Sequence, residues 1–206
     1  MSKGYDTPAA RAFGEFVEKK SRFIGYIAPV ETEEEAIAFI NEIRTKHRDA
    51  RHNVYAYLVN NGGIVNQRYS DDGEPQGTGG MPVMDVILKR GLTNCCIVVT
   101  RYFGGVLLGA SGLVRAHSKG ASMAADAAGV KTVVKCRLVE VNMPYGVYDR
   151  VSSLAAAKGY EQAESDFGAG VRVSYMVPEE EAEGFAAEIT DVSAGKANCN
   201  ISDDIL

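Results

Sequence analysis

Three carboxylates stand within four positions, at Asp71, Asp72 and Glu74, in the glycine-rich stretch SDDGEPQGTGG. Carboxylates so close together could bind Mg²⁺ or divide the roles of general acid and general base. Asp72-Gly73 is also an ordinary turn pair, and carboxylates in such turns cap backbone N–H groups or pair with arginines. This second interpretation carries more weight, and a pair with Arg101 would test it. His52 is the only histidine expected near the site.

A second group of candidate residues follows the apolar run NCCIVVT. A buried strand that enters a glycine-rich turn and then a helix leaves free backbone N–H groups and the positive end of a helix dipole at one place, which favours anions. Arginines could add bidentate phosphate contacts, and an aromatic side chain could stack on bases. The residues expected to bind nucleic acid or another anion are Arg101, Tyr102, Gly104, Gly105, Gly109, Arg115 and Lys119.

Simpler structural roles are open for some of these residues. The glycines alone would suit a tight β-to-α turn with positive φ angles, and Arg115 and Lys119 alone fit a solvated helix face. The spacing from Gly104 to Ser111 superficially matches a phosphate loop, but Ala110 stands where that loop needs its lysine. No GxGxxG fingerprint or GxSxG nucleophile elbow occurs. We therefore predict no catalytic residues, no metal and no cofactor.

The first part of the chain must position these groups with a mixture of strands and helices. Periodicity and turn signals predict a strand or hairpin over residues 15–30, a helix to about His47, strands over 52–59 and on to Tyr69, an ordered loop over 70–80, a helix over 82–90, a strand over 94–100 and a helix over 110–128.

After Gly129 the pattern restarts as a second, compact unit. We expect a strand over 132–143, a helix over 144–158, strands over 160–167 and 171–177, a helix after Pro178 and a final strand over 197–202. The order βαββαβ is the ferredoxin-like arrangement. The predicted fold is therefore α+β, with two domains at residues 1–131 and 132–206.

Composition and charge narrow the class of protein. No apolar run approaches the roughly 20 residues of a membrane span, and the N-terminus lacks a signal-peptide pattern, so we expect a cytoplasmic protein with no membrane partner. The four cysteines suggest neither disulfides nor a zinc site. Residues 1–131 hold 16 Lys/Arg against 14 Asp/Glu, whereas residues 132–206 hold 6 against 13. Only the first domain could present a basic face to nucleic acid.

The blocks HNVYAY, DDGEPQGTGGMPV and VVTRYFGGVLLGASGLVRAHS closely resemble signatures of the IMPACT family, in its bacterial YigZ-type members. The resemblance implies an N-terminal left-handed βαβ domain like domain IV of elongation factor G. It also implies RNA or ribosome binding and regulation of translation. Leu107 stands where the family typically has lysine, which removes one phosphate-facing cation. Besides the anion-binding residues above, the resemblance marks a motif loop and its neighbours: His52, Asn53, Asp71, Asp72, Glu74, Thr78 and Gly80.

Three functional hypotheses follow. The first is a noncatalytic RNA- or ribosome-binding protein in which Arg101, Tyr102 and Arg115 contact phosphate and base. The second is a protein–protein regulatory module that uses the acidic second domain as its docking surface. The third is a metal-dependent hydrolase that uses Asp71, Asp72 and Glu74.

Overall fold

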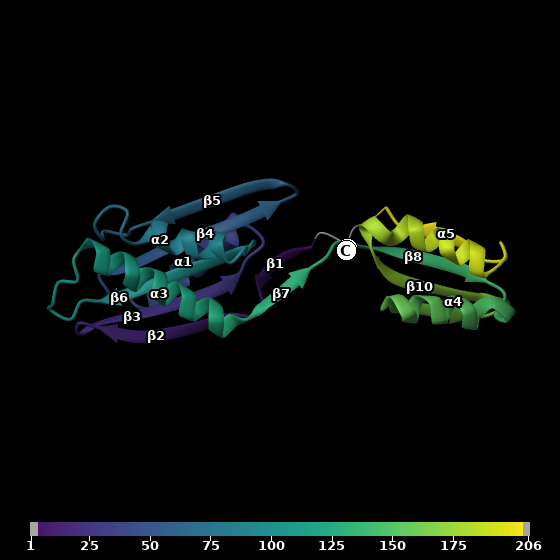
Figure 1. Cartoon of the computed structure of the whole chain (residues 1–206), viewed down its shortest axis with the longest axis horizontal. Helices are drawn as coiled ribbons and strands as arrows, with labels where there is room; N and C mark the ends of the chain where they lie inside the picture. Colours follow the sequence, from purple (N-terminus) through teal and green to yellow (C-terminus); the bar gives the residue numbers. More distant parts are fainter. Residues whose placement is uncertain (1–3, 204–206) are drawn as a thin grey trace. The chain divides into compact units, whose positions relative to one another are not determined.

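The chain folds as two compact units, and the computed structural model describes residues 4–203 (Figure 1). The first unit is Tyr5–Val133, and the second comprises Gly4 and residues 134–203. The sequence places the domain boundary at 131/132, inside a strand of the first unit. Residues 1–3 and 204–206, which the predicted domains include, lie outside the described residues.

The first unit is built on a five-stranded antiparallel sheet with the order β2-β3-β6-β4-β5. The central strand β6 is buried along its apolar run, as the sequence predicts. The strands are β2 (Ala12–Glu18), β3 (Ser21–Pro29), β4 (His52–Asn61), β5 (Ile64–Ser70) and β6 (Cys95–Tyr102).

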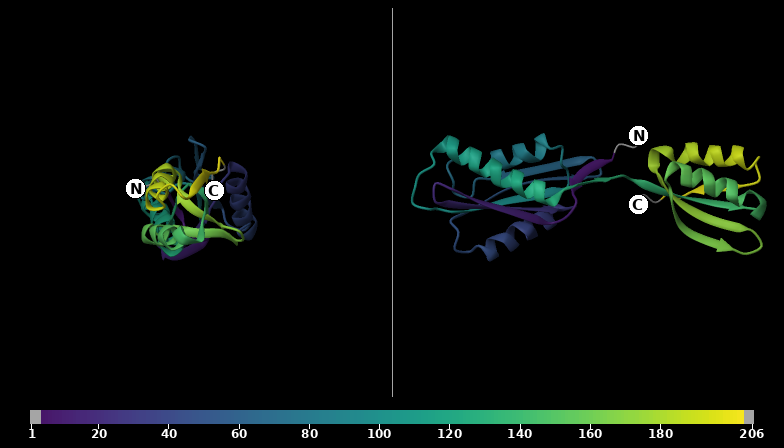
Figure 2. Two further views of the ribbon diagram at one scale, coloured as in Figure 1. Left: turned by 90° about the vertical axis from the view of Figure 1, so that its right-hand side faces the viewer. Right: turned by 60° about the horizontal axis from the view of Figure 1, so that its bottom comes forward.

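Helices cover both faces of this sheet. The helix α1 (Glu33–Lys46) packs on one face, and α2 (Gly80–Lys89) and α3 (Ala110–Ala128) pack on the other (Figure 2). Since successive side chains on a strand point to opposite faces, β6 contributes to two cores. Ile97 and Val99 pack with α2 and α3, whereas Cys96 and Val98 pack with α1.

A short two-stranded antiparallel ladder joins the two ends of the first unit. The strand β1 (Tyr5–Pro8), which the sequence analysis did not predict, pairs with β7 (Val130–Val133). The Thr7 hydroxyl donates to the Asn94 carbonyl at 3.0 Å and ties β1 to the start of β6. The single strand predicted over 132–143 is therefore two, β7 and β8 (Cys136–Met143).

The second unit has the predicted ferredoxin-like order, with an antiparallel sheet β11-β8-β10-β9. One face of the sheet packs with both helices around Val141, Val173, Val151 and Phe185. After β8, its elements are α4 (Tyr145–Lys158), β9 (Glu161–Phe167), β10 (Val171–Pro178), a 3₁₀ turn (Glu179–Glu181), α5 (Ala182–Val192) and β11 (Asn198–Ile201). The α+β fold with two domains is confirmed.

Among residues 4–203, none of the helices has the length and apolar character needed to cross a membrane.

Candidate functional site

The loop between β5 and α2 is held together by Asp71. Its carboxylate accepts hydrogen bonds from the backbone N–H groups of Gly77, Gly79 and Gly80 at 2.8 to 2.9 Å. Burial acts to raise the pKa of Asp71, but these three donors favour the ionised form and hold the pKa below its ordinary value. Asp71 therefore closes the loop and fixes the start of α2.

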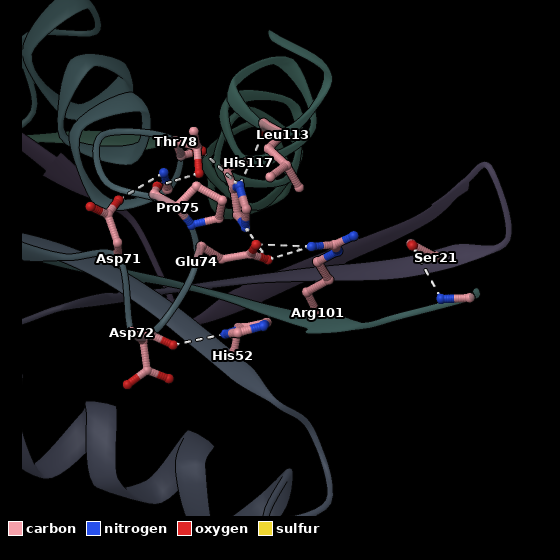
Figure 3. Close-up of polar contacts among 12 residues, drawn as sticks. Ser21, His52, Asp71, Asp72, Glu74, Pro75, Thr78, Arg101, Leu113 and His117 are labelled. Carbon is pink, nitrogen blue, oxygen red and sulfur yellow. Dashed lines mark hydrogen bonds and ion pairs between the residues drawn. The ribbon is translucent and has the colours of Figure 1, made fainter. Parts of the chain in front are cut away.

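Asp72 joins the same loop to β4 and α1. Its carboxylate accepts from the Asn53 backbone N–H at 2.6 Å and from the Arg44 guanidinium at 2.6 Å. Its backbone carbonyl accepts from Nδ1 of His52 at 2.9 Å (Figure 3). The side chain of Asn53 in turn accepts from the Thr100 hydroxyl of β6. His52 and Asn53 thus lie at the predicted loop and help to position it.

Glu74 lies in a buried cluster with Arg101 and His117 on the α2/α3 face of the sheet (Figure 3). Nη1 of Arg101 donates to both carboxylate oxygens, at 2.7 and 2.9 Å. Nδ1 of His117 contacts the carbonyls of Thr78 and Leu113, both at 3.0 Å, so this nitrogen carries the hydrogen. Nε2 of His117 lies 3.8 Å from Glu74. The predicted pairing of a loop carboxylate with Arg101 is present.

These contacts do not support the metal-dependent hydrolase. Asp71 turns toward backbone N–H groups, Asp72 toward Arg44 and Asn53, and Glu74 toward Arg101. The three carboxylates therefore do not converge on one ion or one substrate atom. Over residues 4–203, no cluster of three or more His, Cys, Asp or Glu side chains is arranged to hold a metal ion.

Arg101 and Tyr102 do not share a site, contrary to the prediction. The strand β6 continues through both residues, so their side chains emerge on opposite faces of the sheet. The Tyr102 hydroxyl donates to Asp49 and accepts from Nδ1 of His47, each at 2.9 Å. Nε2 of His47 then accepts from the Tyr26 hydroxyl at 2.7 Å. Tyr102 therefore belongs to a directed hydrogen-bond chain beneath α1.

The glycines of the β6–α3 turn have different roles. A Cβ on Gly104 would lie 1.9 Å from the Lys20 carbonyl oxygen, so close packing against the β2–β3 turn requires glycine there. Gly105 and Gly109 have positive φ angles of 84° and 75°. Gly109 is the N-cap of α3 and has no side chain to cap the helix. The first turn of α3 therefore presents backbone N–H groups, as predicted.

Two pockets flank the start of α3. The pocket of about 350 Å³, here called the α3 N-terminal pocket, is lined by Arg51, His52, Gly73, Glu74, Pro75, Arg101, Phe103, Leu107, Leu108, Gly109, Ala110 and Leu113. The pocket of about 240 Å³, here called the α3 groove, is lined by Phe16, Glu18, Lys19, Leu108, Gly112, Arg115, Ala116 and Lys119. The two predicted basic groups are therefore separated, with Arg101 in the first pocket and Arg115 and Lys119 in the second.

The α3 groove is lined by cations that are not neutralised. Lys19, Arg115 and Lys119 take part in none of the ion pairs found among the described residues. Nζ of Lys119 lies 4.4 Å from the centroid of the Phe16 ring, which holds this lysine over the groove. Glu18 is the one carboxylate of the lining.

The sequence analysis missed three participants. It expected His117 away from the site, although His117 lies one helical turn after Leu113 and contacts the Thr78 carbonyl of the loop. It also gave no role to Lys19 and Phe16. The Lys-Lys pair after an alternating strand was the available signal, since it marks the β2–β3 turn that faces α3.

Comparisons with known proteins agree with the family resemblance that the signature blocks indicate. The model of the Impact N-terminal domain matches residues 19–125, and that of a domain of unknown function (DUF1949) matches residues 141–196. The chain is 35% identical to the IMPACT family member YvyE of Bacillus subtilis, over 96% of this chain and 91% of that protein. It is 34% identical to YigZ of Escherichia coli, over 86% and 87% of the two chains.

A solved structure is also similar over the whole length. The crystal structure of a hypothetical protein superposes with a TM-score of 0.63 and 30% sequence identity, covering 99% of this chain and 100% of that one. The similarity to these relatives therefore spans both domains of the chain. The chain belongs to the IMPACT family, as a relative of its YigZ-type members.

Proposed function

We propose that the first unit is a noncatalytic RNA-binding module of a cytoplasmic protein and that the α3 groove contacts the phosphate backbone. One observation carries this proposal: Lys19, Arg115 and Lys119 line a single groove and have no carboxylate partner in an ion pair among residues 4–203. Unpaired cations on a shared surface are the groups that displace counterions from a nucleic-acid backbone. A role in translation follows if the bound RNA is ribosomal.

The α3 groove suits the phosphate backbone of an RNA strand better than a single isolated anion. Its cations come from two elements, with Lys19 in the β2–β3 turn and the other two on α3, so successive phosphates can be contacted along one path. The first unit carries nearly balanced charge overall, so attraction comes from this local cluster and not from bulk charge.

The direct test removes the two helix cations together. An Arg115→Ala/Lys119→Ala variant should bind single-stranded RNA at least tenfold more weakly than the wild type at low salt. The slope of log K against log salt concentration should become shallower by about 1.4, because each lost phosphate contact contributes about 0.7 for a single strand. Fluorescence anisotropy with a labelled oligoribonucleotide, measured at several salt concentrations, gives both quantities.

The matched control removes two exposed cations elsewhere in the same unit. Arg68 and Lys89 are 71% and 80% exposed, so an Arg68→Ala/Lys89→Ala variant loses the same net charge outside the groove. Its RNA affinity should stay within twofold of the wild type. Equal losses in the two double variants would mean that net charge alone drives binding, and the groove would then have no specific role.

A second candidate function concerns the second unit. The face of its sheet opposite the helices presents Glu140 of β8 and Ser174 of β10 beside Glu164 of β9. None of the other residues of β8 and β10 that alternate onto this face is aromatic. They are Cys136, Leu138, Asn142, Arg172, Met176 and Pro178. An acidic face without aromatic side chains is unsuited to stacking on bases. We propose that it docks a basic segment of a protein partner.

This docking surface has its own test. A lysine-rich peptide should bind the wild-type protein more strongly than a Glu140→Gln/Glu164→Gln variant, as measured by calorimetry at low salt. RNA binding should be unchanged in that variant. Equal peptide binding by the two proteins would remove the acidic face from consideration.

A further inference from the structure

The α3 N-terminal pocket contains hydrogen-bond donors that the protein itself does not use. The N-cap Gly109 offers no side chain to α3, and the first helical hydrogen bond is that of Leu113 N–H to the Gly109 carbonyl. The N–H groups of Ala110, Ser111 and Gly112 therefore precede the hydrogen-bonded ladder of a 19-residue helix. Such a helix start attracts an anion by its dipole and by its free donors.

Arg101 independently indicates a ligand at this place. The residue is only 5% exposed, it lines the pocket, and both of its hydrogen bonds to Glu74 come from Nη1. Its Nε has no hydrogen-bond partner, although it is buried. A buried donor without an acceptor destabilises the fold, because it has lost its hydrogen bonds to water and gained none in return. An acceptor oxygen from a ligand would satisfy the edge of the guanidinium that Glu74 leaves unused.

The balance of charge in the pocket favours an anion over a cation. Glu74 is the one carboxylate of the lining, and both of its oxygens are occupied by Arg101. Arg51 adds a guanidinium that is exposed and makes no ion pair with a described residue. With the dipole of α3, the pocket is left with a net positive potential. Planar guanidinium groups match the geometry of phosphate oxygens.

The remaining lining is apolar and open to solvent. Phe103 is 44% exposed and Leu107 is 81% exposed, and they border the pocket with Leu108, Leu113 and Pro75. The Phe103 ring lies over the Arg101 guanidinium, with 5.4 Å from Cζ to the ring centroid. One face of the ring therefore packs on Arg101. Exposed large apolar side chains beside an anion site suit a ligand whose charged group carries a planar, partly apolar body.

We propose that the α3 N-terminal pocket binds a nucleoside monophosphate, either free or at the end of an RNA strand. The phosphate would lie between the start of α3, Arg51 and the free edge of Arg101, and the base would pack on Phe103 and Leu107. The volume of about 350 Å³ lies within the range of about 300 to 1,000 Å³ of small-molecule sites. This proposal does not depend on RNA binding in the α3 groove, which is lined by different cations.

Calorimetric titration of the full-length protein with AMP tests the proposal. We expect saturable binding at one site, with adenosine and inorganic phosphate each at least tenfold weaker, because each lacks one half of the recognised group. Absence of saturable AMP binding at millimolar concentration would overturn the proposal. Equal affinities for AMP and adenosine would overturn the assignment of the phosphate to the helix start.

Variants of exposed residues locate the ligand while Glu74 and Arg101 themselves are kept. Arg51→Gln and Phe103→Ala should each weaken AMP binding at least fivefold, and Leu107→Lys should strengthen it by adding a cation beside the helix start. Arg48→Gln, which removes an exposed arginine outside the pocket lining, is the matched control and should bind AMP like the wild type. If Arg51→Gln and Arg48→Gln have equal effects, the site is wrongly placed.

Two further experiments distinguish binding in the α3 N-terminal pocket from binding in the α3 groove, and distinguish a free nucleotide from the end of an RNA strand as the ligand. The Arg115→Ala/Lys119→Ala variant should lose RNA affinity and keep AMP affinity, whereas Phe103→Ala should lose AMP affinity. A 5′-phosphorylated oligoribonucleotide that competes with AMP, where its 5′-hydroxyl counterpart does not, identifies a strand end as a ligand. If neither oligonucleotide competes while AMP binds, the pocket takes the free nucleotide.

Discussion

Arg101 has one purpose in the fold and, in our proposal, a second purpose in binding a ligand. Nη1 neutralises Glu74 in the core between the sheet and α3, whereas Nε is buried without a hydrogen-bond partner in a residue that lines the α3 N-terminal pocket. The prediction of a simple phosphate contact from the sequence overlooked the first purpose. A residue that is almost fully buried and paired contributes to stability first, so substitution of Arg101 cannot by itself separate folding from binding.

The Glu74–Arg101 pair is predicted to be strongly coupled. Because both side chains are nearly inaccessible, removal of one leaves a buried charge without a partner, and Glu74→Leu or Arg101→Met should each lower the free energy of unfolding by about 3 to 5 kcal/mol. The double variant, which leaves no unpaired charge, should lose less than the sum of the two single losses. Urea denaturation measures the four proteins. Additive losses would show that the pair is not coupled.

The two buried histidines should make the protein less stable at mildly acidic pH. Burial lowers the pKa of His117 and of His47 below the ordinary value of about 6.5. Below that pH the unfolded chain binds protons that the folded chain does not, so the free energy of unfolding falls as the pH decreases toward the folded pKa values.

His117→Asn tests the contribution of one of these histidines. Asparagine can keep a donor toward the carbonyls of Thr78 and Leu113, and it does not titrate. The loss of unfolding free energy between pH 7.5 and pH 5.5 should therefore be smaller in this variant than in the wild type, whatever its stability at pH 7.5. An unchanged pH dependence, measured by urea denaturation at a series of pH values, would contradict the direction assigned to His117.

At the scale of elements, a helix or strand that carries a pattern within its own segment could be predicted from the sequence, whereas a strand that depends on long-range pairing could not. The apolar run of β6 and the periodicity of α3 gave both elements their correct type, because each signal is local. The strand β1 has the sequence YDTP and pairs with residues more than 120 positions away, so nothing local marks it.

The largest error at the candidate site came from the end of β6. The strand predicted from the sequence ends at Thr100, where its apolar run stops, and Arg101 and Tyr102 were grouped at the strand end as members of one binding site. Pairing with Phe23 and Arg22 of β3 extends the strand by these two residues. The alternation of a strand then sends them to opposite faces, a physical rule that was available but was applied to too short an element.

The contact between β3 and α3 depends on two facing glycines. A Cβ on Gly25 would lie 2.0 Å from the backbone oxygen of Gly120, so Gly25→Ala must push α3 away from the sheet and should lower the free energy of unfolding by about 3 kcal/mol or more. Gly14, which is paired with Gly25 across β2 and β3, is the matched control. Its added Cβ would meet Met123 at 3.0 Å, so Gly14→Ala should be clearly milder. Equal losses in thermal denaturation would contradict this account of the helix–sheet packing.

At the scale of the whole molecule, the two units differ in their balance of charge and have separate hydrophobic cores. The basic groups of the α3 groove lie in the first unit, whereas residues 132–206 hold 13 acidic residues against 6 basic ones. Each unit also has a hydrophobic core of its own, centred on the five-stranded sheet in one and on the ferredoxin-like sheet in the other. Separate cores mean that damage to one unit need not reach the other.

A core substitution in the second unit should therefore leave RNA binding intact. Ile189 of α5 is fully buried, and Ile189→Ala removes side-chain volume that its surroundings cannot refill, at a cost of about 2 to 5 kcal/mol to that unit alone. Hydrogen exchange resolved by segment should show faster exchange in β8, α4, β10 and α5, with unchanged protection in β6 and α3. Anisotropy should give wild-type RNA affinity at a temperature where the second unit of the variant has unfolded. If β6 loses its protection and the variant also loses its RNA affinity, the two units unfold as one. RNA binding would then require both units to be folded and could not be assigned to the first unit alone.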